Sequence, residues 1–154
     1  MIEVKEGSKA PAFSGFDQNG NRVSLKDYLG KKIILYFYPH DDTPGCTAQA
    51  CNLKDNYTQL LNKGFIVVGI STDNIRSHKK FEQKYNLPFI LVADEGQKIV
   101  DKYGVWGEKK FMGRTFVGTH RTTFLIDEKG RIKKIIRKPD TKNQTQQVLE
   151  AWEL

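Results

Sequence analysis

A repeated alternation of apolar strands and helices through the middle of the chain limits its fold more than any other feature. Three runs are continuous, apolar and rich in β-favouring residues, as in strands that are covered on both faces: Lys31–Pro39, Phe65–Thr72 and Pro88–Asp94. Each run is followed by a segment that reads as a helix: Cys46 to about Lys63, Asn74–Asn86 and Gly96–Gly104. Strands that alternate with helices indicate a mostly parallel sheet.

Hairpin signals flank this central region. Asn19-Gly20 is a strong short-range signal for a hairpin near the N-terminus, and Arg121–Lys138 predicts a second hairpin near the C-terminus. Thr141–Leu154 predicts a closing helix. We therefore expect an α/β fold with a mixed central sheet and helices on both of its faces. No linker-like stretch divides the chain, so we expect one domain over residues 1–154.

The charge of the chain does not indicate a nucleic-acid-binding protein. Lys and Arg number 25 and Asp and Glu 18, which gives a net charge of +7. The basic residues are spread along the chain and mixed with acids, and the densest cluster, Lys129–Lys138, alternates with apolar residues as in a half-solvated strand. A basic, solvated surface explains this pattern, and nucleic acid is not an expected partner.

Membrane partners are not expected either. No apolar run approaches the ~18 residues of a membrane span. The segment MIEVKEGSKAP lacks the apolar core of a signal peptide, so we expect a cytoplasmic protein. In a reducing compartment two cysteines indicate catalysis, metal binding or packing rather than a structural disulfide.

Both cysteines fall in the stretch PHDDTPGCTAQAC, which begins at Pro39. Thr43 is a good N-cap, and Pro44 fits the first position of a helix. Cys46 then lies in the first turn, where free amide groups and the helix dipole favour a thiolate. Gly45 lets a substrate approach the backbone closely. These features predict that Cys46 is a reactive nucleophile.

The second cysteine, Cys51, lies too far along the helix for a disulfide with Cys46. Five residues of an ideal helix separate the two Cα atoms by about 8.7 Å, whereas a disulfide tolerates roughly 4.4–6.8 Å. Two possibilities remain open. Cys51 is an ordinary helical cysteine, or the first turns of the helix unwind to let it reach Cys46.

Other cysteine-based sites fit less well. A thioredoxin-type exchange site has the spacing C-x-x-C, whereas this chain has C-x-x-x-x-C. A metal site needs further ligands, and His40 and His120 flank the predicted site without ligand spacing. His78 falls in an amphipathic helix and is predicted to be a solvated surface residue. No metal site is expected.

These motifs together resemble those of a known family. PHDDTPGCT fits the P-x-x-x-T-x-x-C signature of peroxiredoxins, and with TPGCTAQAC, YGVWGEKKFMG and RTTFLID the chain resembles the bacterioferritin comigratory protein (PrxQ) subfamily. The resemblance extends in order from GSKAPAF to the final helix. It implies a thioredoxin-like fold with an added N-terminal hairpin. Two residues depart from the common pattern: Gln49, where many members carry Glu, and His40, where Lys is common.

The resemblance also implies roles for individual residues. Cys46 becomes the peroxidatic cysteine and Cys51 the resolving one. Thr43 would hydrogen-bond the peroxide and the thiolate, and Pro39 would shield the pocket from water. Arg121 would place its guanidinium beside the thiolate, where a fixed cation stabilises the charge that develops on the leaving oxygen. Trp106 and Phe111 either line the pocket or belong to the core.

The expected function is that of a thiol peroxidase that reduces hydrogen peroxide and organic hydroperoxides. The expected cycle needs no cofactor, forms an intramolecular disulfide and is completed by thioredoxin or a similar dithiol. Members of the subfamily are often monomeric, and we expect a monomer. The alternative is a disulfide oxidoreductase or peroxide sensor without high peroxidase turnover.

Overall fold

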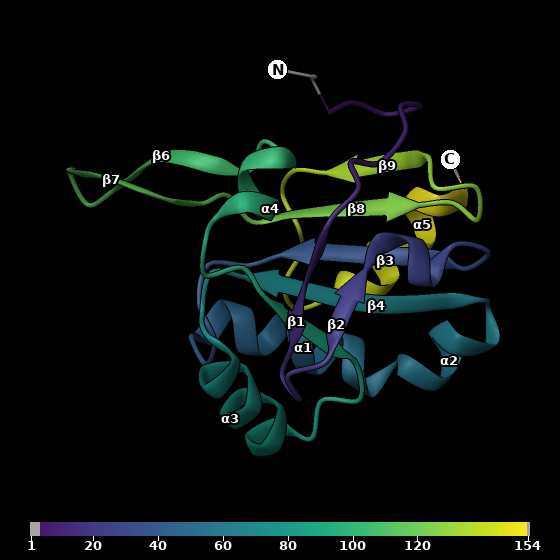
Figure 1. Ribbon diagram of the computed structural model, residues 1–154, viewed down its shortest axis with the longest axis horizontal. Coiled ribbons are helices and arrows are strands. Elements are labelled where there is room, and N and C mark those ends of the chain that lie inside the picture. Colours follow the sequence, from purple (N-terminus) through teal and green to yellow (C-terminus); the bar gives the residue numbers. More distant parts are fainter. Residues whose placement is uncertain (1–3, 154) are drawn as a thin grey trace.

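The computed structural model describes residues 4–153, so residues 1–3 and the last residue of the predicted closing helix lie outside it. Its main sheet has seven strands in the order β2-β1-β5-β4-β3-β8-β9. These strands are β1 (Ser14–Asp17), β2 (Arg22–Ser24), β3 (Lys32–Phe37), β4 (Phe65–Ser71), β5 (Ile90–Ala93), β8 (Thr122–Ile126) and β9 (Ile132–Ile136). β3 lies between β4 and β8 in the middle of the sheet (Figure 1).

The predicted mixed sheet is confirmed. β3, β4 and β5 are parallel to one another, whereas β1 and β8 pair antiparallel with β5 and β3. The hairpin β1–β2 turns at Gly20, whose φ of 78° lies in the left-handed region that glycine adopts without strain. The hairpin β8–β9 turns at Gly130, where φ is 83°. Both hairpins occur where the sequence predicts them.

Helices cover both faces of the sheet. They are α1 (Pro44–Asp55), α2 (Tyr57–Asn62), α3 (Ile75–Tyr85), α4 (Lys98–Lys102) and α5 (Gln144–Glu153), with a 3-10 turn, η1 (Leu25–Tyr28). Alternate residues of β3 enter two separate cores. Leu35 and Phe37 pack with Ile99 of α4, whereas Tyr36 packs with Cys46 and Ala50 of α1. Within residues 4–153, no helix has the length and apolar character needed to cross a membrane.

The structure differs from the prediction in two places. The predicted helix from Cys46 to Lys63 is broken at Asn56, which ends α1 and begins α2 with φ −110° and ψ 13°. The Asn56 side chain donates to the carbonyl of Asn52, a local bond that competes with helix continuation. A further hairpin, β6 (Trp106–Phe111) with β7 (Arg114–Thr119), was not predicted. It forms a separate two-stranded sheet that extends from one end of the molecule (Figure 1).

Candidate active site

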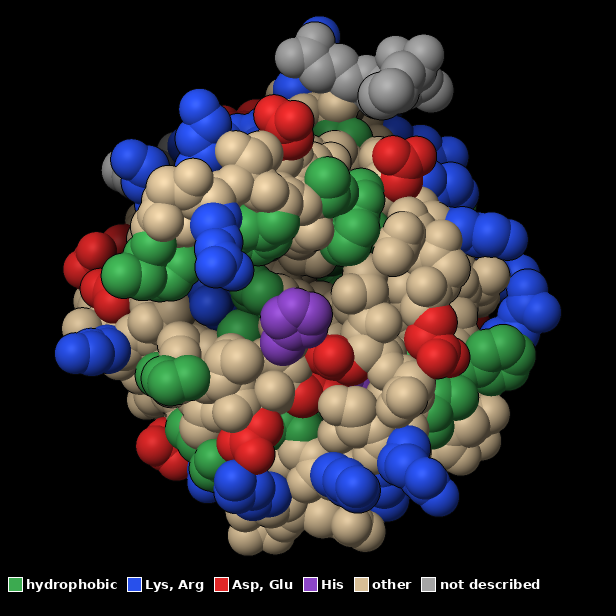
Figure 2. All heavy atoms as spheres, turned by 90° about the vertical axis from the view of Figure 1, so that its left-hand side faces the viewer, with side chains coloured by type: hydrophobic (Ala, Val, Ile, Leu, Met, Phe, Trp, Pro, Cys, Tyr) green, Lys and Arg blue, Asp and Glu red, His purple; other side chains and the backbone are tan. Residues whose placement is uncertain are grey.

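Both cysteines lie on α1, which follows the carboxyl end of β3. The carboxyl ends of parallel strands form the sheet edge at which open α/β folds carry their chemistry. Figure 2 looks onto this end of the molecule, where a hollow lies beside a histidine side chain and is surrounded by hydrophobic and basic side chains. The predicted position of Cys46, just beyond an early central strand, is confirmed.

Cys46 lies in the first turn of α1, and its side chain is completely buried. Pro44 occupies the start of the helix, and Thr43 precedes it in extended backbone with φ −92° and ψ 157°. The predicted N-cap and helix start are therefore confirmed. Amide groups of this turn and the positive end of the helix dipole lie near the sulfur, and both favour a negative charge there.

Arg121 donates a hydrogen bond from its Nη2 to the Cys46 Sγ over 3.4 Å. It directly precedes β8, the antiparallel neighbour of β3. Gly45 makes room for this guanidinium, because a Cβ at that position would lie 3.0 Å from the same Nη2. The structure thus brings Arg121 to Cys46, where its fixed charge stabilises a thiolate.

Neutral side chains hold the Arg121 guanidinium in place. The Oε1 of Gln49 accepts from Arg121 Nη1 over 2.8 Å, and the Nε2 of Gln49 donates to the Oε1 of Gln144 over 2.8 Å. The hydroxyl of Thr123 donates to the same Gln144 oxygen over 2.7 Å. Because these partners carry no charge, they orient the guanidinium without neutralising it. Its full positive charge remains available to the sulfur.

Thr43 presents its hydroxyl at the start of α1. Its Oγ1 donates to the carbonyl of His40 over 3.0 Å, and within the described chain no amide of α1 donates to this oxygen. Thr43 therefore occupies the N-cap position of α1, but its side chain accepts no hydrogen bond from the helix. A hydroxyl that has already donated its hydrogen keeps lone pairs that accept from a substrate O–H.

A cavity of about 220 Å³ lies between the loop that follows β3 and the hairpin β6–β7. Pro39, Trp106, Phe116 and Val117 contribute apolar surface to its wall. Trp106 therefore lines this cavity and also packs against the core that contains Leu35 and Phe37. Phe111 is 68% exposed at the end of β6 and belongs neither to the cavity wall nor to the core.

Lys109 adds a second cation to this region. It lines the same cavity and donates from its Nζ to the carbonyl of Thr119 over 2.8 Å. Burial lowers the pKa of Lys109, and repulsion by Arg121 lowers it further, while attraction to a Cys46 thiolate raises it. Lys109 therefore adds a positive charge to the wall of this cavity.

Cys51 lies in a different environment from Cys46, although both are on α1. It is partly buried, and burial raises the pKa of its thiol, with a smaller increase from Asp55 and an opposing effect of Lys54. Both thiols are free, and α1 is continuous from residue 44 to residue 55. The two cysteines therefore lie on an intact helix, the arrangement for which their spacing rules out a disulfide.

The prediction that His78 is a solvated surface residue is wrong. Its side chain is fully buried on α3, because both ring nitrogens have hydrogen-bond partners from other segments. Nδ1 lies 2.7 Å from the Oδ2 of Asp41, and Nε2 lies 3.0 Å from the carbonyl oxygen of Val92. Asp41 belongs to the loop between β3 and α1, so His78 connects α3 to the segment that carries Thr43.

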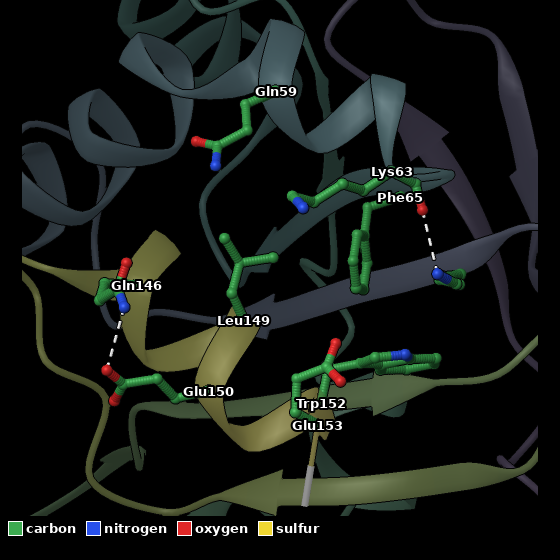
Figure 3. A pocket seen from close by; sticks show the side chains of 9 residues that line it. Gln59, Lys63, Phe65, Gln146, Leu149, Glu150, Trp152 and Glu153 are labelled. Atoms are coloured by element: carbon green, nitrogen blue, oxygen red, sulfur yellow. Dashed lines mark hydrogen bonds between the residues drawn. The ribbon is translucent and has the colours of Figure 1, made fainter.

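A larger hollow lies at the other end of β3 and β4, away from Cys46. It has a volume of about 870 Å³ and is lined by side chains of α2 and α5 together with Lys32 and Phe65, which lie at the first residues of β3 and β4 (Figure 3). Cys46, Arg121 and Thr43 are not part of its wall, nor of the wall of the smaller cavity, but the smaller cavity is lined by Pro39 and His40 of the loop that leads to Thr43. Size alone does not identify the site, because the charged and nucleophilic groups described above converge elsewhere.

Known proteins match this chain over nearly its whole length. Residues 7–135 match the AhpC/TSA family. The chain belongs to this family. It is 45% identical over 149 residues to peroxiredoxin Bcp of Escherichia coli K12, covering 97% of this chain and 96% of the relative. It is 40% identical over 150 residues to peroxiredoxin Bcp of Bacillus subtilis, with 97% and 96% covered.

Solved structures of the same family have the same fold. A PrxQ mutant from Xylella fastidiosa superimposes with a TM-score of 0.91 at 25% identity, covering 99% of this chain and 98% of that one. The bacterioferritin comigratory protein of Xanthomonas campestris, studied for its alkyl peroxide reduction activity, gives 0.88 at 27% identity, with 97% and 98% covered. The predicted resemblance to peroxiredoxins of this subfamily and the predicted thioredoxin-like fold are confirmed. The chain is a peroxiredoxin, an enzyme that reduces peroxides.

Several groups around the site were not predicted from the sequence. Lys109 and Gln144 come from segments whose place in the fold has no local signature, namely the hairpin β6–β7 and the first residue of α5. Gln49 stood out only as a departure from the pattern of the family.

Proposed function

We propose that this peroxiredoxin reduces hydroperoxides with Cys46 as the attacking nucleophile. The observation that carries the proposal is the Arg121 Nη2 at 3.4 Å from the sulfur of a cysteine in the first turn of a helix. The thiolate forms a bond to one peroxide oxygen while the O–O bond breaks. Sulfur is oxidised to sulfenic acid, and the second oxygen takes the bonding electrons and a proton, and departs as water or an alcohol.

Arg121, Thr43 and Pro39 assist this step in different ways. Arg121 stabilises the thiolate and then the negative charge that develops on the leaving oxygen. Thr43 Oγ1, having donated to His40, accepts the O–H of the incoming hydroperoxide. Pro39 contributes apolar surface beside the site and limits the access of water. No metal or organic cofactor takes part in these steps.

The second step joins Cys46 to Cys51. The Cys51 thiolate attacks the sulfenic sulfur, water leaves, and an intramolecular disulfide forms. The first turns of α1 must unwind, because the Cα atoms of an intact helix lie about 8.7 Å apart at this spacing. Unwinding also exposes Cys51 to water and removes the burial that raises the pKa of its thiol, so the resolving thiolate becomes available only when it is needed.

Both hydrogen peroxide and organic hydroperoxides are proposed substrates, since the apolar wall of the 220 Å³ cavity suits an alkyl group. Thioredoxin or a similar dithiol reduces the disulfide by exchange. A single-domain monomer is sufficient for this cycle, because both cysteines and Arg121 come from one chain. The cycle needs reduced thiols, so we propose a cytoplasmic location, where thiols are kept reduced.

The decisive experiment is a peroxidase assay with a thioredoxin system, applied to the wild type and to Cys46→Ser and Cys51→Ser. Cys46→Ser should lose all peroxide consumption, because a hydroxyl cannot replace the thiolate. Cys51→Ser should complete one attack and then stop as sulfenic acid, with over-oxidation under excess peroxide. Far-UV circular dichroism of the wild type should show a reversible loss of helix after one equivalent of peroxide.

Two results would contradict the proposal. Peroxide consumption by Cys46→Ser above about 1% of wild-type turnover would remove Cys46 from its role, since loss of an assisting donor alone costs only ~10²–10³-fold. An oxidised protein that contains only intermolecular disulfides would remove Cys51 as the partner. Disulfide exchange without peroxide consumption by the wild type would instead indicate an oxidoreductase or sensor.

A further inference from the structure

Asp41 is the most densely hydrogen-bonded residue of the loop between β3 and α1. Its Oδ1 accepts from the hydroxyl of Tyr38 over 2.6 Å, and its Oδ2 accepts from the hydroxyl of Ser77 over 2.7 Å. The same Oδ2 lies 2.7 Å from the Nδ1 of His78. The side chains of Asp41 and His78 are only 4% and 0% exposed. A buried carboxyl group therefore connects the residue that follows β3 with α3 and the loop.

Both ring nitrogens of His78 face oxygen atoms that accept hydrogen bonds. Nε2 lies 3.0 Å from the carbonyl oxygen of Val92, which has no hydrogen to donate, so Nε2 must carry a proton. The gap of 2.7 Å between Nδ1 and Asp41 also needs a proton, either on the ring or on the carboxyl group. If the ring carried a proton only on Nε2 and Asp41 were ionised, the lone pair of Nδ1 would face a lone pair of the Asp41 oxygen.

The surroundings of Asp41 decide where that proton lies. Two hydroxyl groups, from Tyr38 and Ser77, donate to the carboxyl oxygens, and donors of this kind favour the ionised form. Burial raises the pKa of Tyr38 well above its usual range, and the charge of Asp41 raises it further, so Tyr38 remains a donor at physiological pH. The arrangement fits a carboxylate that faces a doubly protonated imidazolium ring.

A metal ion is a poorer explanation of the same residues. Ligand atoms of Asp41, Asp73 and His78 lie within 4.8 Å of one another. The Oδ2 of Asp73, however, accepts from the Asp41 amide over 2.8 Å and from the Ser71 hydroxyl over 2.7 Å. Each ring nitrogen of His78 and each oxygen of Asp41 likewise already has a partner. A cation would have to displace several of these bonds.

The network fixes the segment on which Thr43 and the start of α1 depend. Asp41 is held through its side chain and its amide, and the next residue, Asp42, accepts from Lys84 and Tyr85 of α3, each over 2.7 Å. Asp42 has a φ of 59°, a conformation that a non-glycine residue keeps only when its surroundings impose it. Thr43 follows directly, so its position depends on these two aspartates.

We propose that His78 is a positioning residue for peroxide reduction: its imidazolium, bonded to Asp41, holds the loop 39–43 and the first turn of α1 in the conformation that attacks peroxide. The proposal rests on the function proposed above. Loss of the ring proton breaks the bond between His78 and Asp41, frees the loop and favours the unwound form of α1. Attack by Cys46 then becomes slower, whereas formation of the disulfide with Cys51 becomes faster.

Three titratable side chains from neighbouring segments lie close to the His78 ring. They are Asp41 from the loop, Tyr38 directly after β3 and Asp73 from the segment before α3; from β5 the backbone carbonyl of Val92 faces the ring. Glu82, one turn further along α3, is bonded to Lys79 and Gln18 instead. Among the described residues, Asp41 is therefore the acidic group that shares a hydrogen bond with the ring.

The first test observes the ring directly by ¹⁵N NMR of histidine-labelled, reduced protein, and it does not depend on peroxidase activity. We expect Nδ1 and Nε2 of His78 both to have the chemical shifts of protonated nitrogens at pH 7, with assignment by comparison with His78→Phe. One protonated and one unprotonated ring nitrogen at this pH would overturn the proposal. A protein without peroxidase activity but with a doubly protonated ring would refute the proposed function instead.

The second test measures attack on peroxide by Cys46 and formation of the disulfide with Cys51 separately, by stopped-flow. His78→Phe keeps a ring of similar volume, and we expect attack by Cys46 to slow by about tenfold, as for a misplacement of less than 1 Å. Disulfide formation should become faster in the same variant, and over-oxidation should require more peroxide. A variant that is merely less well folded would not accelerate one step while it slows the other.

Asp41→Asn is the variant that keeps the tests decisive if His78→Phe folds poorly. An asparagine amide can donate to an unprotonated Nδ1, so the connection no longer needs the imidazolium. We expect the ring of this variant to carry a single proton in the ¹⁵N spectra at pH 7, and its rate of attack to stay closer to that of the wild type than the rate of His78→Phe does. A ring that stays doubly protonated in Asp41→Asn, or equal rates of both steps in His78→Phe and wild type, would refute the proposal.

Discussion

Replacing Gly45 by alanine should weaken catalysis while it leaves the fold equally or more stable. A Cβ at residue 45 would lie 3.0 Å from Arg121 Nη2, the atom that donates to the Cys46 sulfur over 3.4 Å. Unstrained contact needs a separation of about 3.5 Å, so the guanidinium must move by roughly 0.5 Å. Arg121 is free to move only at the expense of its bonds to Cys46 and Gln49.

The size of the effect follows from that displacement. If the separation of sulfur and Nη2 grows from 3.4 Å by roughly 0.5 Å, the attraction between their charges falls by about 0.6 kcal/mol at an effective dielectric constant of ~20. That is about threefold in rate, and poorer alignment of the hydrogen bond extends the expected range to about tenfold. Alanine also favours helix over glycine by up to ~1 kcal/mol, which should raise the free energy of unfolding.

The assay is the second-order rate of peroxide attack by stopped-flow, paired with urea unfolding. Gly96→Ala is the matched control, because its Cβ would meet only the flexible side chain of Lys98, at 3.8 Å. The Gly45→Ala substitution should have no effect on rate in an Arg121→Ala background, since the group that it displaces is then absent. An unchanged rate in the single variant, or an equal decrease in both backgrounds, would refute the reasoning.

Two further predictions concern single side chains. Arg121→Ala should slow peroxide attack by ~10²–10³-fold, because a fixed charge beside the sulfur is lost; a rate within threefold of the wild type, in the same stopped-flow assay, would show that the contact is not catalytic. Tyr36→Phe should raise the free energy of unfolding by about 1 kcal/mol in urea titrations, because the Tyr36 hydroxyl is buried with no hydrogen-bond partner among the described residues. Tyr38→Phe is the control, because it removes a hydroxyl that donates to Asp41, and should be destabilising.

The central fold could be predicted because its signals are local. Continuous apolar strands such as Ile33–Phe37 have no polar face to present to water, so they can only lie inside a covered sheet. Asn19-Gly20 and Gly130 supply the left-handed conformations that the two predicted hairpins need. The start of α1 could also be predicted, since Thr43 and Pro44 define a helix start by themselves and place Cys46 in the first turn.

The missed features depend on contacts between distant segments. β6 and β7 pair with each other rather than with the main sheet, so most of their side chains are exposed or half-buried and show no regular alternation. His78 looks like a surface residue on α3, because a polar side chain on an amphipathic helix is normally solvated. Its partners, Asp41 and Val92, lie 37 and 14 residues away, and only the folded sheet brings them together.

The proposed cycle requires α1 to be folded in one step and unwound in the next, and the chemistry of Cys46 itself can drive this change. The sulfur is completely buried, and the guanidinium of Arg121 that donates to it is the group that stabilises a negative charge there. Sulfenic acid is neutral and one oxygen larger, so oxidation removes the charge that Arg121 stabilises and adds volume at a buried position. The first turn of α1 is thereby destabilised after the peroxide has reacted and not before, which is the order that resolution by Cys51 requires.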